Sequence, residues 1–329
     1  MNLLDDIERL VTCESPSTDL AAVARSADVT AAVGSALLGT QPERIVLDGR
    51  THLRWRLGSG PRRVLLLGHH DTVWPIGSLE RIPFEARDGV TVLVTGDEEI
   101  GSPSSRGLIE TEAREHRAAL VTEGAADGGA LKTGRKGTSM YEVTLHGRAA
   151  HAGLEPERGV SATVEAAHQV LAVSKLTDLA AGTTVTPTVL TAGTTTNTVA
   201  AQGKFAVDVR VRSLAEQQRV DQVMRALEPV LDGAKIEVTG GPNRPPMEPS
   251  ASTALFGLAR RLGAELGLDL AQAAVGGASD GNFTAGVGTP TLDGLGAVGG
   301  GAHAETEHVL VSELVPRTQL LAALVHELT

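Results

Sequence analysis

Histidine and acidic side chains follow three short apolar runs of the sequence and one glycine-rich turn. His69 follows the run 64–67, Glu98 and Glu99 follow the run 90–94, and Glu123 follows the run 118–121. His303 follows the glycines at 299–301. Because open α/β sheets bind ligands where the carboxyl ends of their strands meet, we expect these side chains to share one crevice.

The chemistry of this set is that of a divalent metal site. Two adjacent carboxylates, Glu98 and Glu99, repel each other in a cleft unless a cation or a proton compensates their charge. One of them can then bind a metal while the other acts as a general base toward water. Imidazole and carboxylate ligands together suit zinc. Asp71, two residues after His69, can orient that imidazole through its second nitrogen.

Each cluster taken alone also has an ordinary explanation. His69 could be a strand-end histidine with a structural hydrogen bond, and the acidic pair could belong to a solvated loop. Glu123 could be a solvated loop residue, and the glycines before His303 could form only a flexible turn. The metal interpretation therefore depends on the four clusters together.

The composition excludes several other classes of function. The 329 residues include 29 Lys and Arg against 40 Asp and Glu, a formal charge of −11, and only 2% are aromatic. Because no basic run of five or more residues exists, this acidic chain has no electrostatic footprint for nucleic acid. Its one cysteine, Cys13, excludes a disulfide framework and a four-cysteine zinc site. The apolar runs are far shorter than the ~20 residues of a membrane span, and residues 1–6 lack a signal-peptide pattern. We therefore expect a cytoplasmic protein with no membrane partner.

The elements that position these clusters are those of an α/β sheet. The apolar runs 64–67, 90–94 and 118–121 show no alternation, which favours buried parallel strands, and residues 104–116 form a plausible crossover helix between the last two. Further helices are predicted at 3–11, 19–38, 252–266 and 312–328, with a strand at 289–292.

A second, smaller domain interrupts this sheet. Residues 139–146, 162–176, 185–191, 205–211, 215–231 and 234–238 follow the order β-α-β-β-α-β, which is typical of a ferredoxin-like sandwich. A proline-rich break at 240–246 ends it. We expect a discontinuous metal-binding domain at 1–134 and 244–329, with an inserted domain at 135–243.

Five ordered motifs resemble a known family across essentially the whole chain. They are His69-x-Asp71-Thr72, the run 97–102, the run 147–153 around His151, the run 276–281, and the His303 loop. The chain resembles the aminoacylase and glutamate carboxypeptidase family of cocatalytic-zinc enzymes, which includes acetylornithine deacetylase and succinyl-diaminopimelate desuccinylase. It looks most like glutamate carboxypeptidase.

The resemblance implies two Zn²⁺ ions per chain, with Co²⁺ or Mn²⁺ as alternatives. His69 and Glu123 would bind one ion, and Glu99 and His303 the other. Glu98 would be the general base, taking a proton from water and passing it to the leaving amine.

The inserted domain would be a lid through which the chain forms a homodimer. His151 would reach the partner subunit's active site and stabilise an oxyanion. Arg210 and Asn197 match positions that grip the substrate carboxylate, although Arg210 could equally be an ordinary surface cation. Gly276, Gly277 and Ser279 would line the substrate pocket. Ala200 and Ala278 replace a proline and a glycine of the family, which affects only pocket details.

One departure is large. The family places a segment with a metal-bridging aspartate and a helix between the first two ligand strands, and here Gly89 runs directly into Val90. Parallel neighbouring strands need a crossover of a dozen or more residues, usually helical, and residues 72–89 show no helical period. Either these strands are not neighbours or sequence is missing here; the latter predicts an 89–90 Cα distance well beyond ~3.8 Å.

The predicted function is that of a dinuclear zinc exopeptidase that releases an amino acid with a free carboxylate from a small peptide or N-acyl amino acid. An N-acyl-amino-acid deacylase is the alternative within the same class. If the missing segment is a genuine deletion, the third hypothesis is that the chain is a catalytically impaired dimeric binding protein.

Overall fold

The computed structural model describes residue 6 and residues 9–10, 12–13, 15–58, 64–70, 90–304 and 306–329. The chain divides into two compact units, Met1–Arg135 with Met247–Thr329, and Lys136–Pro246. Asp71 and the Gly89–Val90 junction lie outside the described residues, as does most of the helix predicted at 3–11.

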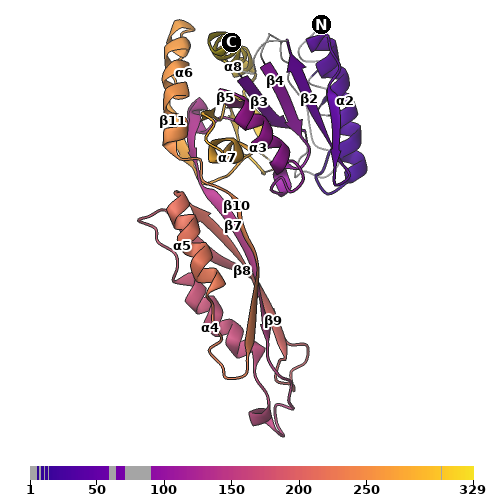
Figure 1. The fold of residues 1–329 in the computed structure, drawn as a ribbon, viewed down its shortest axis with the longest axis vertical. Coiled ribbons are helices and arrows are strands. Elements are labelled where there is room, and N and C mark those ends of the chain that lie inside the picture. Colours follow the sequence, from indigo (N-terminus) through magenta and orange to yellow (C-terminus); the bar gives the residue numbers. More distant parts are fainter. Residues whose placement is uncertain are drawn as a thin grey trace. The chain divides into compact units, whose positions relative to one another are not determined.

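A six-stranded mixed sheet forms the centre of the first unit (Figure 1). The three predicted strands are parallel neighbours, because β3 pairs with both β4 and β5. The possibility that the first two are not adjacent is therefore wrong. An antiparallel hairpin, β1–β2, extends the sheet beyond β4 and was not predicted. The order is β1 (Glu43–Leu47), β2 (Arg50–Leu57), β4 (Val90–Thr95), β3 (Val64–His69), β5 (Ala118–Val121) and β12 (Thr291–Leu292).

Helices cover both faces of this sheet. Leu66 and Leu120 pack in one core cluster with apolar residues of α2, α6 and α8, whereas Leu65 and Leu67 pack in another with α3 and α7. Alternate residues of a strand point to opposite faces, so a continuous run of leucines serves both cores. These helices are α2 (Leu20–Leu38), α3 (Arg106–Glu115), α6 (Thr253–Glu265), α7 (Gly281–Gly286) and α8 (Val311–Leu328).

Helix α2 is long and apolar enough to cross a membrane by length and composition. Its Ala27 and Ala31 belong to the core cluster of the sheet with Trp55 of β2. A side chain at Gly34 would lie 2.6 Å from that indole ring, so the helix packs directly on β2. This packing is that of a core helix.

Short elements complete the first unit. A two-stranded parallel pair joins β6 (Leu131–Arg135) to β11 (Gln272–Val275), and an antiparallel pair joins β13 (Gly299–Gly300) to β14 (His308–Val309). Three 3₁₀ turns accompany them: η1 (Glu98–Ile100), η2 (Asp127–Gly129) and η4 (Pro249–Ala251).

The second unit is a four-stranded antiparallel sheet with two helices. Its strand order, β10-β7-β9-β8, is that of the predicted ferredoxin-like sandwich. Alternating Phe205, Val207 and Val209 are buried in its core. Its elements are β7 (Gly137–His146), η3 (Pro156–Arg158), α4 (Ala162–Ser174), β8 (Thr184–Ala192), β9 (Gln202–Val211), α5 (Leu214–Arg225) and β10 (Lys235–Arg244).

Two boundaries in this unit differ from the prediction by six residues each. The strand β10 does not end before the proline-rich stretch but continues to Arg244, with a register shift at Pro242. Proline lacks only its own N–H, so it is tolerated at such an irregularity of an edge strand. The helix predicted at 215–231 ends at Arg225, four residues before Pro229.

Candidate metal centre

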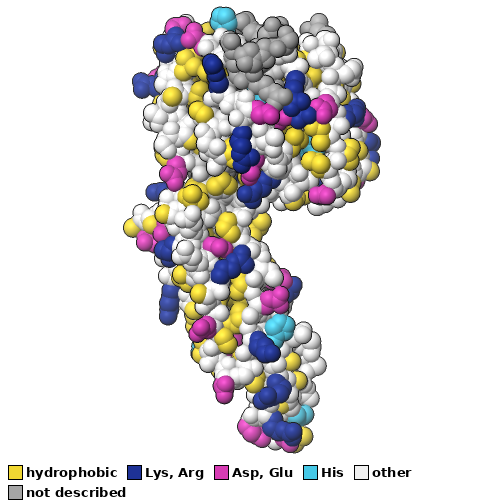
Figure 2. Space-filling view, in the orientation of Figure 1, with side chains coloured by type: hydrophobic (Ala, Val, Ile, Leu, Met, Phe, Trp, Pro, Cys, Tyr) yellow, Lys and Arg dark blue, Asp and Glu magenta, His cyan; other side chains and the backbone are white. Residues whose placement is uncertain are grey.

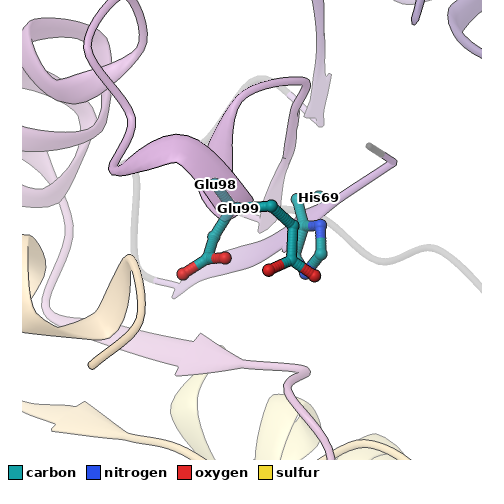
Figure 3. A group of neighbouring side chains, drawn as sticks. All are labelled: His69, Glu98 and Glu99. Carbon is teal, nitrogen blue, oxygen red and sulfur yellow. The ribbon is translucent and has the colours of Figure 1, made fainter. Parts of the chain in front are cut away.

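Three strand ends bring acidic and imidazole side chains together in the first unit. His69 is the last residue of β3, Glu98 and Glu99 form the turn η1 after β4, and Glu123 follows β5. Donor atoms of His69, Glu98 and Glu99 all lie within 4.8 Å of one another (Figure 3). His69 Nε2 is 3.2 Å from Glu123 Oε1, and His303 Nε2 is 3.6 Å from Glu99 Oε2.

These distances fit a shared cation. With metal–ligand bonds of about 2.0–2.2 Å, two ligands of a tetrahedral ion lie roughly 3.3–3.6 Å apart. The 3.2 and 3.6 Å separations of the two histidine–glutamate pairs are close to that range. Nitrogen and oxygen donors of this kind suit zinc and similar divalent ions.

The turn that carries Glu98 and Glu99 is fixed by the fully buried Asp97. Its carboxylate accepts hydrogen bonds from the backbone N–H groups of Ser104 and Ser105, at 2.7 and 3.2 Å, and from both hydroxyls. The chain then turns through Gly101, whose φ of 89° favours glycine. Glu98 is only 7% exposed. The acidic pair is therefore part of a rigid turn.

His69 and His70 have different surroundings although they are adjacent. The His70 ring donates from Nε2 to the carbonyl of Thr51, at 3.0 Å, and packs beside Gly96. His69 contacts the donor group instead, because successive side chains of a strand alternate between faces.

The charge of Glu123 is stabilised by its neighbours. Burial favours a higher pKa, but the hydrogen bond and charge of His69, with the charges of Arg135 and Lys132, lower the pKa of Glu123 to about 2. The carboxylate is therefore ionised at neutral pH and available as a ligand.

His303 lies in the turn between β13 and β14, and its side chain is 64% exposed. Its φ of 63° is left-handed, which is uncommon for a residue with a side chain. Gly301, two residues earlier, is also left-handed and accepts a hydrogen bond from the N–H of Ala304. The tight turn directs the imidazole toward Glu99.

The loop after β11 contains the predicted pocket residues. Gly276 and Gly277 are exposed, and the carbonyl of Gly277 accepts a hydrogen bond from Arg135. Ser279 is fully buried, and its hydroxyl donates to Asp293 at 2.6 Å. Asp280 accepts hydrogen bonds from Thr95 and Ser102, which connects this loop to the acidic turn.

The remaining predicted residues lie in the second unit. His151 is exposed, its Nδ1 accepts the N–H of Gly153 at 3.1 Å, and Ala152 donates to the carbonyl of Asn197. His151 and Asn197 thus lie on neighbouring segments. Arg210 forms a bidentate ion pair with Asp208 at 2.8 and 2.9 Å on the same strand.

Sequence reasoning missed Arg135 and Asp293, which form a buried ion pair beside Glu123. A signal for one of them existed. Asp293 directly follows the predicted strand 289–292, just as the other acidic residues follow theirs.

Comparisons with known proteins relate this chain to peptidases. Residues 133–265 match the M20 peptidase dimerisation domain. Carboxypeptidase G2 of Pseudomonas sp. (strain RS-16) is 32% identical over 251 residues, which cover 73% of this chain and 59% of that protein. These two matches confirm the resemblance to the aminoacylase and glutamate carboxypeptidase family that the five motifs predict. The uncharacterized protein YqjE of Bacillus subtilis is 27% identical over 192 residues, covering 57% of this chain and 51% of that protein. The chain therefore spans less than two thirds of the length of these curated relatives.

Solved structures show the same fold. The aminopeptidase PepT of Bacillus cereus ATCC 10987 superposes with a TM-score of 0.69 at 19% identity, covering 98% of this chain and 97% of that one. The M20 family metallo-carboxypeptidase Sso-CP2 of Sulfolobus solfataricus gives a TM-score of 0.69 at 15% identity, with the same coverage. The predicted α/β class with an inserted dimerisation domain is confirmed.

Proposed function

We propose that this chain is a dinuclear zinc hydrolase that cleaves an amide bond and releases an amino acid with a free carboxylate. The observation that carries the proposal is the convergence of His69, Glu99, Glu123 and His303 around Glu98. The likeness to carboxypeptidase G2 supports cleavage at a carboxyl terminus. A small peptide or N-acyl amino acid as substrate, with glutamate as the released residue, is what the motif resemblance implies. We expect the enzyme to work in the cytoplasm.

Each of the two histidine–glutamate pairs supplies one metal-binding position. We assign one ion to His69 and Glu123, and the other to Glu99 and His303, because each pair can share a cation at its observed separation. Bound zinc would polarise the scissile carbonyl and lower the pKa of a water molecule. Co²⁺ or Mn²⁺ would suit the same donors.

Glu98 is the general base in this proposal. Its donor atom lies within 4.8 Å of those of His69 and Glu99, one from each histidine–glutamate pair. Its burial and the rigid turn around it hold the carboxylate where it can take a proton from water and return it to the leaving amine.

Substrate recognition is assigned to the second unit and to the loop after β11. Because His151 Nδ1 accepts an N–H, the ring proton sits on Nε2, from which it can donate to an oxyanion. Arg210 and Asn197 would hold the substrate carboxylate, with Arg210 exchanging its ion pair with Asp208 for one with substrate. Gly276 and Gly277 would line the pocket, which the buried Ser279 shapes through Asp293.

We also propose a homodimer formed through the second unit. The strand β8 is at the edge of its sheet, with Val189 and Leu190 63% and 53% exposed. Leu171 and Val164, seven residues apart on α4, are exposed as well. A free strand edge beside exposed apolar side chains suits pairing with a second copy. On the face of the second unit drawn in Figure 2, hydrophobic side chains lie among charged side chains of both signs.

The substitution Glu98→Gln tests the assignment of the base. It removes the proton acceptor and preserves the shape, so we expect a loss of ~10²–10⁴-fold in kcat with unchanged metal content. Amine release from a panel of N-acyl and peptidyl amino acids measures the rate, and elemental analysis measures the metal. Glu265→Gln, on the surface of α6, is the control. Turnover close to that of the parent chain would overturn the assignment.

A further inference from the structure

Arg135, the last residue of β6, is a buried cation beside the metal centre. Its side chain is 4% exposed, and its guanidinium contacts three acceptors. Nε and Nη2 donate to the two carboxylate oxygens of Asp293 at 2.7 and 2.9 Å, and Nη1 donates to the carbonyl of Gly277 at 3.1 Å. Nη2 also lies 3.8 Å from Glu123 Oε2.

The two oxygens of Glu123 therefore have different neighbours. Oε1 faces His69 at 3.2 Å, on the side of the donor cluster, whereas Oε2 faces Arg135. A carboxylate with one oxygen held by a cationic side chain presents the other in a defined direction. Lys132 adds positive charge to the same surroundings, but its single ammonium cannot make the fork-shaped contacts of a guanidinium.

Arg135 is itself fixed by the residues around it. Asp293 is fully buried and also accepts hydrogen bonds from the Ser279 hydroxyl and from the N–H of Gly294. The bidentate pair thus ties the end of β6 to the loop 276–279 and to the residue after β12. A guanidinium held by two oxygens on one side has one orientation in which it can face Glu123.

We propose that Arg135 is a positioning residue for Glu123: it holds Oε2 so that Oε1 is presented to the metal as a single-oxygen ligand. The inference depends on the proposed function for the metal itself. The Arg135–Asp293 pair also couples the Glu123 ligand to the loop 276–279, to which the proposed function assigns part of substrate recognition.

The test is the zinc affinity of Arg135→Lys, measured by competition with a chromophoric chelator. Lysine keeps the charge but loses the fork, so we expect a ~10–100-fold weaker affinity, the usual effect of losing a group that orients a metal ligand. The absorption spectrum of the Co²⁺-loaded variant should also change, because the bands of cobalt respond to ligand geometry. A purely structural role would leave this spectrum unchanged.

Two further variants separate the orientation of Glu123 from the general effect of disturbing a buried ion pair. In Arg135→Met with Asp293→Asn, both buried charges are removed together, which avoids an unpaired buried carboxylate, and zinc should still bind more weakly. Arg54→Lys disturbs another buried ion pair, with Glu112, that includes none of the proposed ligands, and should leave zinc affinity unchanged.

The outcomes are distinct. Parent-like zinc affinity and cobalt spectrum in Arg135→Lys would overturn the inference, as would an equal loss in Arg54→Lys. A parent chain that binds no zinc would refute the proposed function itself.

Discussion

Glu165 of α4 connects that helix to the segment after α5 through a fully buried carboxylate. It lies in the first turn of α4 and accepts hydrogen bonds from the backbone N–H groups of Val230 and Leu231, at 3.0 and 2.8 Å. Gln169 also donates to it, at 2.7 Å. Residues 230 and 231 belong to the connection between α5 and β10, so the carboxylate anchors this loop to α4.

The substitution Glu165→Gln should destabilise this connection by about 2–4 kcal/mol. Hydrogen bonds to a charged acceptor contribute ~1.5–3 kcal/mol and neutral ones ~0.5–1.5, so losing the charge weakens every bond. The new amide also turns one acceptor into a donor, which leaves a buried N–H without a partner at a cost of ~1–3 kcal/mol.

The same contacts make the connection sensitive to acid. Burial favours a higher pKa for Glu165, but the hydrogen bonds from Gln169, Leu231 and Val230 lower it below the ordinary 4.5. A lowered pKa in the folded state stabilises the fold above pH 4.5, and this contribution disappears as the pH falls below that value. The glutamine variant should lack this part of the pH dependence.

Hydrogen exchange followed by mass spectrometry measures the effect directly. A loss of about 2–4 kcal/mol corresponds to roughly 30- to 700-fold faster exchange at residues 230 and 231 when exchange occurs by local opening. Glu157→Gln, at an exposed position, should leave exchange there unchanged. Exchange at the parent rate in Glu165→Gln would refute the anchoring role.

Two further predictions concern the dimer and its shared chemistry. His151→Ala should lower kcat without lowering metal content. If one subunit supplies His151 and the other supplies Arg210 to the same active site, mixing His151→Ala with Arg210→Ala chains should restore activity to part of the dimers; no recovery would mean that one subunit supplies both residues. Leu190→Arg should shift the protein from dimer to monomer in sedimentation, whereas Leu266→Arg, at the exposed residue after α6, should not. A dimer that survives Leu190→Arg would exclude the β8 edge.

Much of the sheet could be predicted because burial on both faces leaves a simple pattern. The runs that form β3, β4 and β5 are apolar without alternation. Residues of the candidate metal centre follow each of them: His69, the pair Glu98 and Glu99, and Glu123, which contacts His69. A strand buried on both sides tolerates few other residues, so the sequence reports it directly.

The β1–β2 hairpin gives a weaker pattern. Arginines at 54 and 56 interrupt the apolar residues of β2. Both form ion pairs with Glu112, a buried residue of α3. Their partner is more than fifty positions away, and only the folded sheet brings the charges together. Residues of this kind look like solvated surface positions in the sequence.

Arg135 was missed for a related reason. In the sequence Arg135 lies close to Lys132 and Lys136, and nothing local distinguishes it from them. Its acceptor Asp293 is 158 positions away. The ligands themselves were found because each follows a strand, whereas the residues that orient them depend on contacts between distant loops. Local sequence patterns thus identify the proposed metal ligands better than the residues that orient those ligands.

The number of zinc ions that the chain retains distinguishes a dinuclear metal centre from any other use of these side chains. After equilibrium dialysis against excess zinc and removal of unbound ions, the parent should retain about two zinc ions per chain, because two histidine–glutamate pairs each supply a site. His303→Ala, which removes a ligand from only one pair, should retain about one. A parent chain that retains no zinc would contradict the account.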